Sequence, residues 1–158
     1  MIRVSVVVSI RNEFLWGMES PHLLKIEHIG IAVKDLSSAE EIYTSLLGVG
    51  PYKREAVERE GVITSFFKTG VNKIELLEST REDGPISKFI DKKGEGIHHI
   101  AFEVYDIKAE MKRLADEGFQ LLSEEPKRGA DDKWVAFIHP KGTKGVLIEL
   151  CQSISTEK

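Results

Sequence analysis

The fold is decided by KIEHIGIAV (residues 25–33), which is closely matched later in the chain by IHHIAFEV (residues 97–104). Both are strand-like runs in which apolar residues alternate with other side chains around a histidine. Each is followed by a further strand containing Ile-Glu-Leu, which carries Glu75 in the first case and Glu149 in the second. His28 and His99 are 71 residues apart, and the two glutamates are 74 residues apart. These similar spacings indicate one supersecondary unit used twice.

The segments between these strands complete the first unit. Ser37 and Glu40 fit a capping box that begins a helix, and Gly48 is placed to end it. Residues 57–68 have the pattern of a hairpin that turns near Gly61 and leads towards the Glu75 strand. The first unit is therefore predicted as strand, helix and three strands.

The second unit follows the same order. Asp106 is expected to cap a helix that Gly118 ends. Residues 119–122 are expected to be extended, and residues 126–133 to form a loop. Strands are predicted over residues 134–139 and 146–151. Two such units can cover each other's apolar faces by forming one sheet.

The predicted fold class is therefore α+β, with two βαβββ modules forming one curved eight-stranded half-barrel sheet around a metal site. The predicted boundaries are an N-terminal extension (1–23), a single domain (24–152) and a tail (153–158). Within the domain we expect module one at 24–80, a linker helix at 84–94 and module two at 96–152. The apolar run in residues 4–10 is short and lacks a cleavage site, so we interpret it as part of an irregular or strand-like extension, with Met18 as an alternative start.

Composition limits the kind of protein. The 158 residues carry a formal charge of −4 with both signs interspersed, so no basic stripe points to nucleic acid. One cysteine excludes an internal disulfide framework and a CxxC zinc site. No apolar run is long enough to span a bilayer. We expect a cytoplasmic protein with neither nucleic acid nor membrane as partner.

Four side chains form the candidate site. Pseudo-twofold pairing of the modules brings His28, Glu75, His99 and Glu149 to the concave face of the sheet. Two neutral imidazoles and two carboxylates suit a borderline divalent ion such as Co²⁺, Ni²⁺, Mn²⁺, Fe²⁺ or Zn²⁺. A single strand histidine is usually structural, but a glutamate inside an apolar strand is costly to bury unpaired. His98 is expected on the opposite face, in a supporting or structural role.

The chain resembles the vicinal oxygen chelate superfamily and, within it, the methylmalonyl-CoA epimerase family. The resemblance runs from about residue 25 to residue 152 and is carried by IEHIGIAV, GIHHIAF, SEEP with Gly129, and HPK leading to GVLIEL. It implies metal-dependent interconversion of the 2R and 2S forms of methylmalonyl-CoA through an enolate. It also implies Co²⁺ as the first expectation for the metal, with Ni²⁺, Mn²⁺ or Zn²⁺ as alternatives. An acyl-CoA substrate and a homodimer are implied as well.

Inversion needs bases on both faces of C2, or one base that reaches both. Glu149 is the first candidate. Some family members carry a second glutamate where this chain has Thr64, whose hydroxyl is too weak an acid or base, so Glu75 becomes the hypothetical partner. The candidates for contacting coenzyme A phosphates, each of which could equally be a solvated charge, are His139, Lys141, Lys144, Lys127 and Arg128.

Other functions stay open on sequence alone. Glyoxalase I uses the same ligand types and a similar proton transfer. An Fe²⁺–oxygen triad of His28, His99 and Glu149 is a second alternative, although Glu75 as a fourth ligand argues against it. A metal-free binding module of the same fold is a third, which four ligand-type side chains make less attractive.

Overall fold

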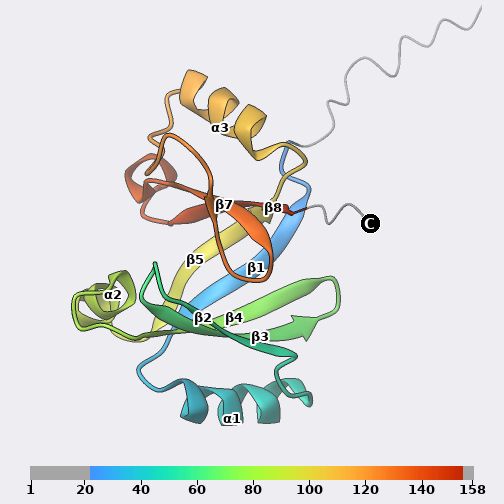
Figure 1. Ribbon diagram of the computed structural model, residues 1–158, viewed down its shortest axis with the longest axis vertical. Coiled ribbons are helices and arrows are strands. Elements are labelled where there is room, and N and C mark those ends of the chain that lie inside the picture. The colour runs from blue at the N-terminus through green and yellow to red at the C-terminus, as the bar shows by residue number, and fades with distance from the viewer. Residues whose placement is uncertain (1–21, 155–158) are drawn as a thin grey trace, which may run out of the picture.

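Residues 22–154 are described by a computed structural model (Figure 1). Most of the predicted extension and the end of the predicted tail, residues 1–21 and 155–158, lie outside the described residues. The strands are β1 (Lys25–Ala32), β2 (Lys53–Val57), β3 (Val62–Thr69), β4 (Asn72–Ser79), β5 (Gly96–Glu103), β6 (Lys127–Arg128), β7 (Lys133–Ile138) and β8 (Ile148–Ser153). The α-helices are α1 (Leu36–Leu47), α2 (Pro85–Lys93) and α3 (Ile107–Asp116), and a 3₁₀ helix, η2, covers Pro140–Thr143.

All eight strands belong to one sheet, in the order β2-β3-β4-β1-β5-β8-β7-β6. Strand β1 pairs in parallel with β4, and β5 pairs in parallel with β8. The two halves meet where β1 and β5 run antiparallel at the centre. The sheet is a curled half-barrel, so the predicted fold class is confirmed, with the modules paired inside one chain (Figure 1).

Each half has its own apolar core, and α1 and α3 lie at opposite ends of the molecule (Figure 1). Helix α1 packs Leu36 and Ala39 against Phe67 and Leu76 of the first half. Helix α3 packs Met111 and neighbouring residues against β7 and β8 of the second half. The concave face of the sheet carries the functional site together with a smaller apolar cluster that includes Val62, Leu77 and Ile86. Among the described helices, none is both long and apolar enough to cross a membrane.

The start of α1 differs from the predicted capping box. Asp35, not Ser37, is the N-cap, and its carboxylate accepts a hydrogen bond of 2.6 Å from the amide of Ser38. Aspartate is as good a cap as serine, and the apolar stripe begins one residue later, at Leu36, which is fully buried. Gly48 ends the helix in the left-handed region, as expected.

The predicted extended segment at residues 119–122 lies beside β7. Leu121 forms an antiparallel bridge to Ile138, and backbone hydrogen bonds of 2.8 Å run from the amide of Leu122 to Phe137 and from the amide of His139 to Gln120. The strand that completes the sheet is the two-residue β6, inside the predicted loop, where Lys127 pairs with Val135. Residues 119–122 therefore pair briefly with β7 at the edge of the sheet, while Phe119 and Leu121 pack against the core beneath α3.

Candidate metal centre and active site

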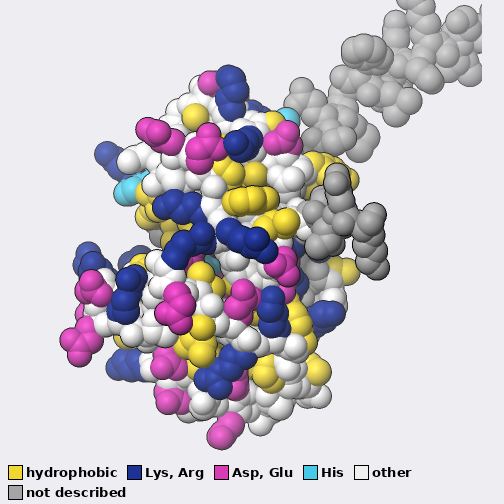
Figure 2. All heavy atoms as spheres, viewed as in Figure 1, with side chains coloured by type: hydrophobic (Ala, Val, Ile, Leu, Met, Phe, Trp, Pro, Cys, Tyr) yellow, Lys and Arg dark blue, Asp and Glu magenta, His cyan; other side chains and the backbone are white. Residues whose placement is uncertain are grey.

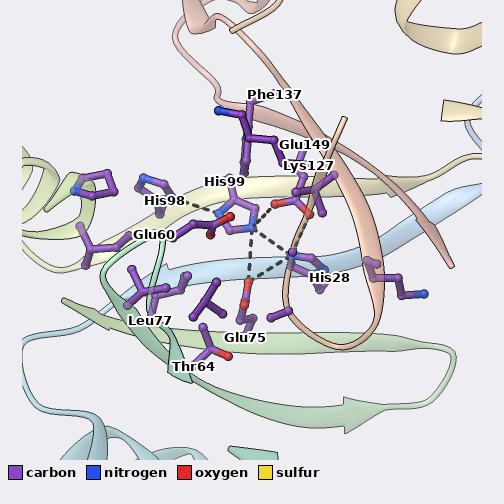
Figure 3. Close-up of a pocket in the computed structure, with 18 of the residues that line it drawn as sticks. His28, Glu60, Thr64, Glu75, Leu77, His98, His99, Lys127, Phe137 and Glu149 are labelled. Carbon is purple, nitrogen blue, oxygen red and sulfur yellow. Dashed lines mark hydrogen bonds and ion pairs between the residues drawn. The ribbon is translucent and has the colours of Figure 1, made fainter. Parts of the chain in front are cut away.

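Four predicted side chains converge where β1, β4, β5 and β8 lie side by side (Figure 3). The Nε2 atoms of His28 and His99 are 2.9 Å apart. The Oε2 atom of Glu75 lies 3.1 Å from Nε2 of His28 and 3.5 Å from Nε2 of His99. Glu149 approaches from the other module, with Oε2 3.3 Å from Nε2 of His99 and Oε1 3.9 Å from Nε2 of His28. All four residues are buried.

A glycine makes room for this arrangement. The antiparallel pairing of β1 with β5 forms the central seam between the two modules. Gly30 of β1 is paired across this seam with His99 of β5, whose ring lies directly against the glycine backbone. A Cβ added at Gly30 would lie 2.1 Å from Cε1 of His99, far inside van der Waals contact. The imidazole of His99, from the other module, therefore fills the space beside Gly30.

The donor set fits a divalent cation. His28, His99 and Glu149 offer ligand atoms that all lie within 4.8 Å of one another. Glu75 lies outside that three-residue group, although it contacts both imidazoles. Imidazole nitrogens and carboxylate oxygens suit borderline divalent metals, and a cation between two buried carboxylates would compensate their charge.

Glu27 contacts the side of the His28 ring that faces away from the site, and it was not among the predicted site residues. Its Oε2 atom lies 2.6 Å from Nδ1 of His28, which leaves Nε2 directed into the site. Strict alternation would put these neighbours on opposite faces, but a register shift between Ile26 and His28 lets both be buried. Lys73 donates a hydrogen bond to Glu27, and Lys133 lies 3.4 Å away. Glu27 could have been recognised by the same feature as Glu75, because each is a glutamate within an apolar strand.

His98 supports His99 in a similar way. Their Nδ1 atoms are 3.0 Å apart, and the His98 ring packs edge-on against Phe89, with the two ring centroids 5.0 Å apart. Burial, followed by the proximity of His99, lowers the pKa of His98 to about 4. His98 is therefore neutral near pH 7. It also lines the pocket, so it is not turned away from the site as expected.

The two site carboxylates have opposite electrostatic environments. Burial acts to raise the pKa of Glu75, but the charge and hydrogen bond of His28 outweigh it and lower that pKa to about 2. For Glu149, burial dominates over the two imidazoles and raises the pKa above its usual value. Burial acts to lower the pKa of His28, but the carboxylates of Glu75 and Glu27 outweigh it and raise that pKa well above its usual value. Two carboxyls whose pKa values are pushed apart are a common basis for acid–base chemistry.

The four residues lie at the floor of a cavity of about 550 Å³. Apolar side chains such as Val62, Leu77 and Phe137 form much of its wall. Thr64 also lines it, and its buried Oγ1 has no hydrogen-bond partner among the described residues. The cavity is therefore suited to a ligand that is partly apolar and carries a few polar groups.

Positive side chains surround the cavity. Arg59, Arg81 and Lys127 are among its lining residues. Figure 2 shows Lys and Arg side chains gathered across the middle of one face, around a hollow between the two halves. Of the five side chains considered for coenzyme A phosphates, Lys127 lines the cavity, while Arg128 is engaged with Asp132 at 3.2 Å. Arg59, Arg81 and Lys127 are therefore the positive groups that the cavity offers to the anionic parts of a ligand.

A second polar cluster links the two modules beside the site. Asp131 accepts hydrogen bonds of 2.8 Å from the hydroxyl of Tyr52 and of 2.8 Å from Nζ of Lys73. Its own amide donates to Glu55 at 3.0 Å. Since Lys73 also contacts Glu27, this cluster connects the support of His28 to the β6–β7 loop of the other module.

Comparison with known proteins defines the class. A profile of the Glyoxalase/Bleomycin resistance protein/Dioxygenase superfamily matches residues 27–137, and the chain belongs to that superfamily. The chain is 42% identical to the ethylmalonyl-CoA/methylmalonyl-CoA epimerase of Cereibacter sphaeroides over 130 residues, covering 81% of this chain and 97% of that protein.

Two further relatives point the same way. The mitochondrial methylmalonyl-CoA epimerase of Homo sapiens is 40% identical over 133 residues, covering 84% of this chain and 76% of that protein. A solved methylmalonyl-CoA epimerase in complex with methylmalonyl-CoA and NH₄⁺ is 39% identical, with a TM-score of 0.81 and coverage of 86% of this chain and 99% of that chain. These three relatives within the superfamily are named as methylmalonyl-CoA epimerases, which does not favour the glyoxalase I alternative.

Proposed function

We propose that this protein is an isomerase that epimerises methylmalonyl-CoA at C2, as the names of its relatives suggest. The observation that carries the proposal is the pair of buried carboxylates, Glu75 and Glu149, on either side of two imidazoles at the floor of one cavity. Two such groups can remove an acidic α-proton from one face of C2 and deliver a proton to the other face.

In this proposal His28, Glu75, His99 and Glu149 hold a divalent metal ion, with Co²⁺ as the first expectation and Ni²⁺, Mn²⁺ or Zn²⁺ as alternatives. Such an ion, when bound, supplies Lewis acidity that stabilises negative charge developing on the thioester oxygen. Glu27 and His98 orient the two imidazoles through their Nδ1 atoms. The site needs this support because a small rotation of either ring would separate its donors.

Glu149 and Glu75 carry the proton transfers. One carboxylate takes the proton from C2, leaving the electron pair in an enolate. The other, in its protonated form, donates a proton to C2 from the opposite face, so that the product differs only in configuration. The two groups exchange these roles when the reaction runs in the opposite direction. The raised pKa of Glu149 fits the group that holds and donates a proton, and the lowered pKa of Glu75 fits the group that is ionised at rest and removes the proton from C2.

The surroundings of the cavity support an acyl-CoA substrate. Arg59, Arg81 and Lys127 offer positive charge to the free carboxylate of the acyl group or to phosphates of coenzyme A. The apolar wall accommodates the methyl group at C2. We also propose a homodimer and a cytoplasmic location, both of which rest on resemblance.

The decisive experiment is a hydrogen-exchange assay on the purified, Co²⁺-loaded protein. We expect deuterium from heavy water to appear at C2 of methylmalonyl-CoA, together with loss of optical purity. Propionyl-CoA, which lacks the second carboxyl group, should exchange far more slowly. Absence of exchange, combined with turnover of the glutathione–methylglyoxal adduct, would replace the epimerase with glyoxalase I.

A further inference from the structure

Glu60 is an acidic residue that the site described above does not use. It lies in the turn between β2 and β3, where its amide donates a 3.0 Å hydrogen bond to the carbonyl of Val57. The carbonyl of the next residue, Gly61, accepts a 2.8 Å hydrogen bond from the amide of Thr80, which fixes the turn against the end of β4. The side chain points into the cavity, on the side of His98 and His99 (Figure 3).

Glu60 differs from the other acidic residues that line the cavity. Glu75 and Glu149 contact the imidazoles, and Glu27 and Asp131 are bound by lysine. Among the described residues, the nearest cation to Glu60 is Arg59, 3.8 Å from its Oε1 atom, and no hydrogen bond holds its carboxylate. Its side chain is 35% exposed, so it reaches both the cavity and the solvent.

The electrostatic environment favours proton exchange by this group. Burial raises the pKa of Glu60, and the nearby charge of Glu75 adds to that effect, while Arg59 lowers it. The resulting pKa lies above the ordinary value of a glutamate. A carboxyl of this kind gains and loses a proton more evenly near neutral pH than an ordinary surface carboxylate.

The proposed reaction needs a group with these properties. After each turnover in one direction, the carboxylate that removed the proton is protonated and the one that donated is ionised. Both are buried, with exposures of 5% each, yet their protonation states must be reversed before the next turnover. A proton must therefore leave the first carboxylate and another must reach the second, through the cavity.

We infer that Glu60 is the proton-relay residue that exchanges protons between the buried carboxylates and solvent after each turnover. This inference rests on the proposed function. The carboxylate of Glu60 accepts the proton that left C2, releases it to water, and returns a solvent proton to the ionised carboxylate by the reverse steps. In this role Glu60 does not act on C2 itself, so the removal of the first proton does not depend on it.

The test compares the rate of a single turnover with the rate of steady-state epimerisation. In Co²⁺-loaded Glu60→Gln, we expect single-turnover deuterium exchange at C2 to stay within about twofold of the unsubstituted protein. Steady-state epimerisation should fall on the order of 100-fold. Raising the concentration of a non-coordinating buffer such as MES should restore much of it, and Glu60→Asp should retain part of the rate. Glu58→Gln, on the same turn but exposed and outside the cavity lining, is the matched control.

Two results would overturn the relay. Unchanged steady-state epimerisation in Glu60→Gln would show that the carboxylate is not used. An equal loss in the single turnover, without rescue by buffer, would assign Glu60 to the chemical step itself or to the structure of the site. Failure of the unsubstituted protein to exchange C2 at all would instead contradict the proposed function, so the two failures can be distinguished.

Discussion

The imidazole of His99 lies against the backbone of Gly30, on the opposite side of the central seam, so closely that a Cβ there would be 2.1 Å from Cε1. Gly30→Ala must therefore displace the ring. Overpacking of this kind costs about 1–3 kcal/mol of unfolding free energy. We expect Co²⁺ affinity to fall by about tenfold or more, because His99 loses its position.

Isothermal titration with Co²⁺ and urea unfolding would measure the two effects of Gly30→Ala. Gly50→Ala is a suitable control, since a Cβ at Gly50 meets nothing within 4 Å. Unchanged metal affinity in Gly30→Ala would show that His99 is not held in place by this contact.

Glu27→Gln tests the support behind His28. The substitution keeps the shape of the side chain but removes the charge that lies 2.6 Å from Nδ1 of His28. Loss of such a support lowers metal affinity by about 10–100-fold, which Co²⁺ titration would detect. Glu103→Gln, on the corresponding strand of module two and near Lys25 at 3.5 Å, should leave the affinity unchanged. Equal effects in both variants would point to general electrostatics and not to orientation of one ring.

The substitution Glu75→Gln tests whether Glu75 acts only as a metal ligand or also as a base. An amide oxygen can still bind the metal, so we expect the ion to stay bound. An amide cannot accept the substrate proton, so exchange at C2 should fall by about 10²–10⁴-fold. Metal content and deuterium uptake should be measured on the same preparation. Near-normal exchange would move the base role to another residue.

Asp131 gives a prediction for the dependence of stability on pH. Burial acts to raise its pKa, but hydrogen bonds from Lys73 and Tyr52 lower it overall. A carboxyl with a lower pKa in the folded state contributes its full stability above its unfolded pKa of about 3.9, and loses it as the pH falls through the folded value. Asp131→Asn should thus cost about 1–2 kcal/mol at pH 7, and this difference should shrink as the pH falls below about 4.

Urea unfolding of Asp131→Asn and of the unsubstituted protein at pH 7 and pH 3 would measure this. Asp132→Asn is the control, because the neighbouring residue has the same left-handed backbone but an exposed carboxylate. A difference that stayed constant with pH would mean that the hydrogen bonds of Asp131, and not its charge, carry the effect.

Sequence repetition was sufficient to predict the half-barrel and the meeting of four side chains. Glu75 and Glu149 were recognisable because a carboxylate in an apolar strand needs a partner, and the repeat supplied one for each. The same reasoning applies to Glu27, but strict alternation along a regular strand would place it on the opposite face from His28. A local register shift in β1 depends on pairing with β5, which a single strand sequence does not contain.

Residues in loops and turns were the least predictable. Glu60 reaches the cavity because the β2–β3 turn is hydrogen-bonded to Thr80, a contact between segments that the sequence pattern does not connect. Strand β6 has two residues and exists through its pairing with β7, so no periodicity could identify it. These features come from tertiary contacts and not from local sequence preference.

The pairing of β1 with β5 at the centre of the sheet also affects how the protein unfolds. Each half of the molecule packs its own core, and the halves are joined at the sheet chiefly through backbone pairing of β1 and β5. An ion held by donors from both halves would bind the two halves to each other and stabilise their association. Chelation should therefore do more than abolish activity: it should broaden the unfolding transition and lower its cooperativity, as the halves begin to unfold independently.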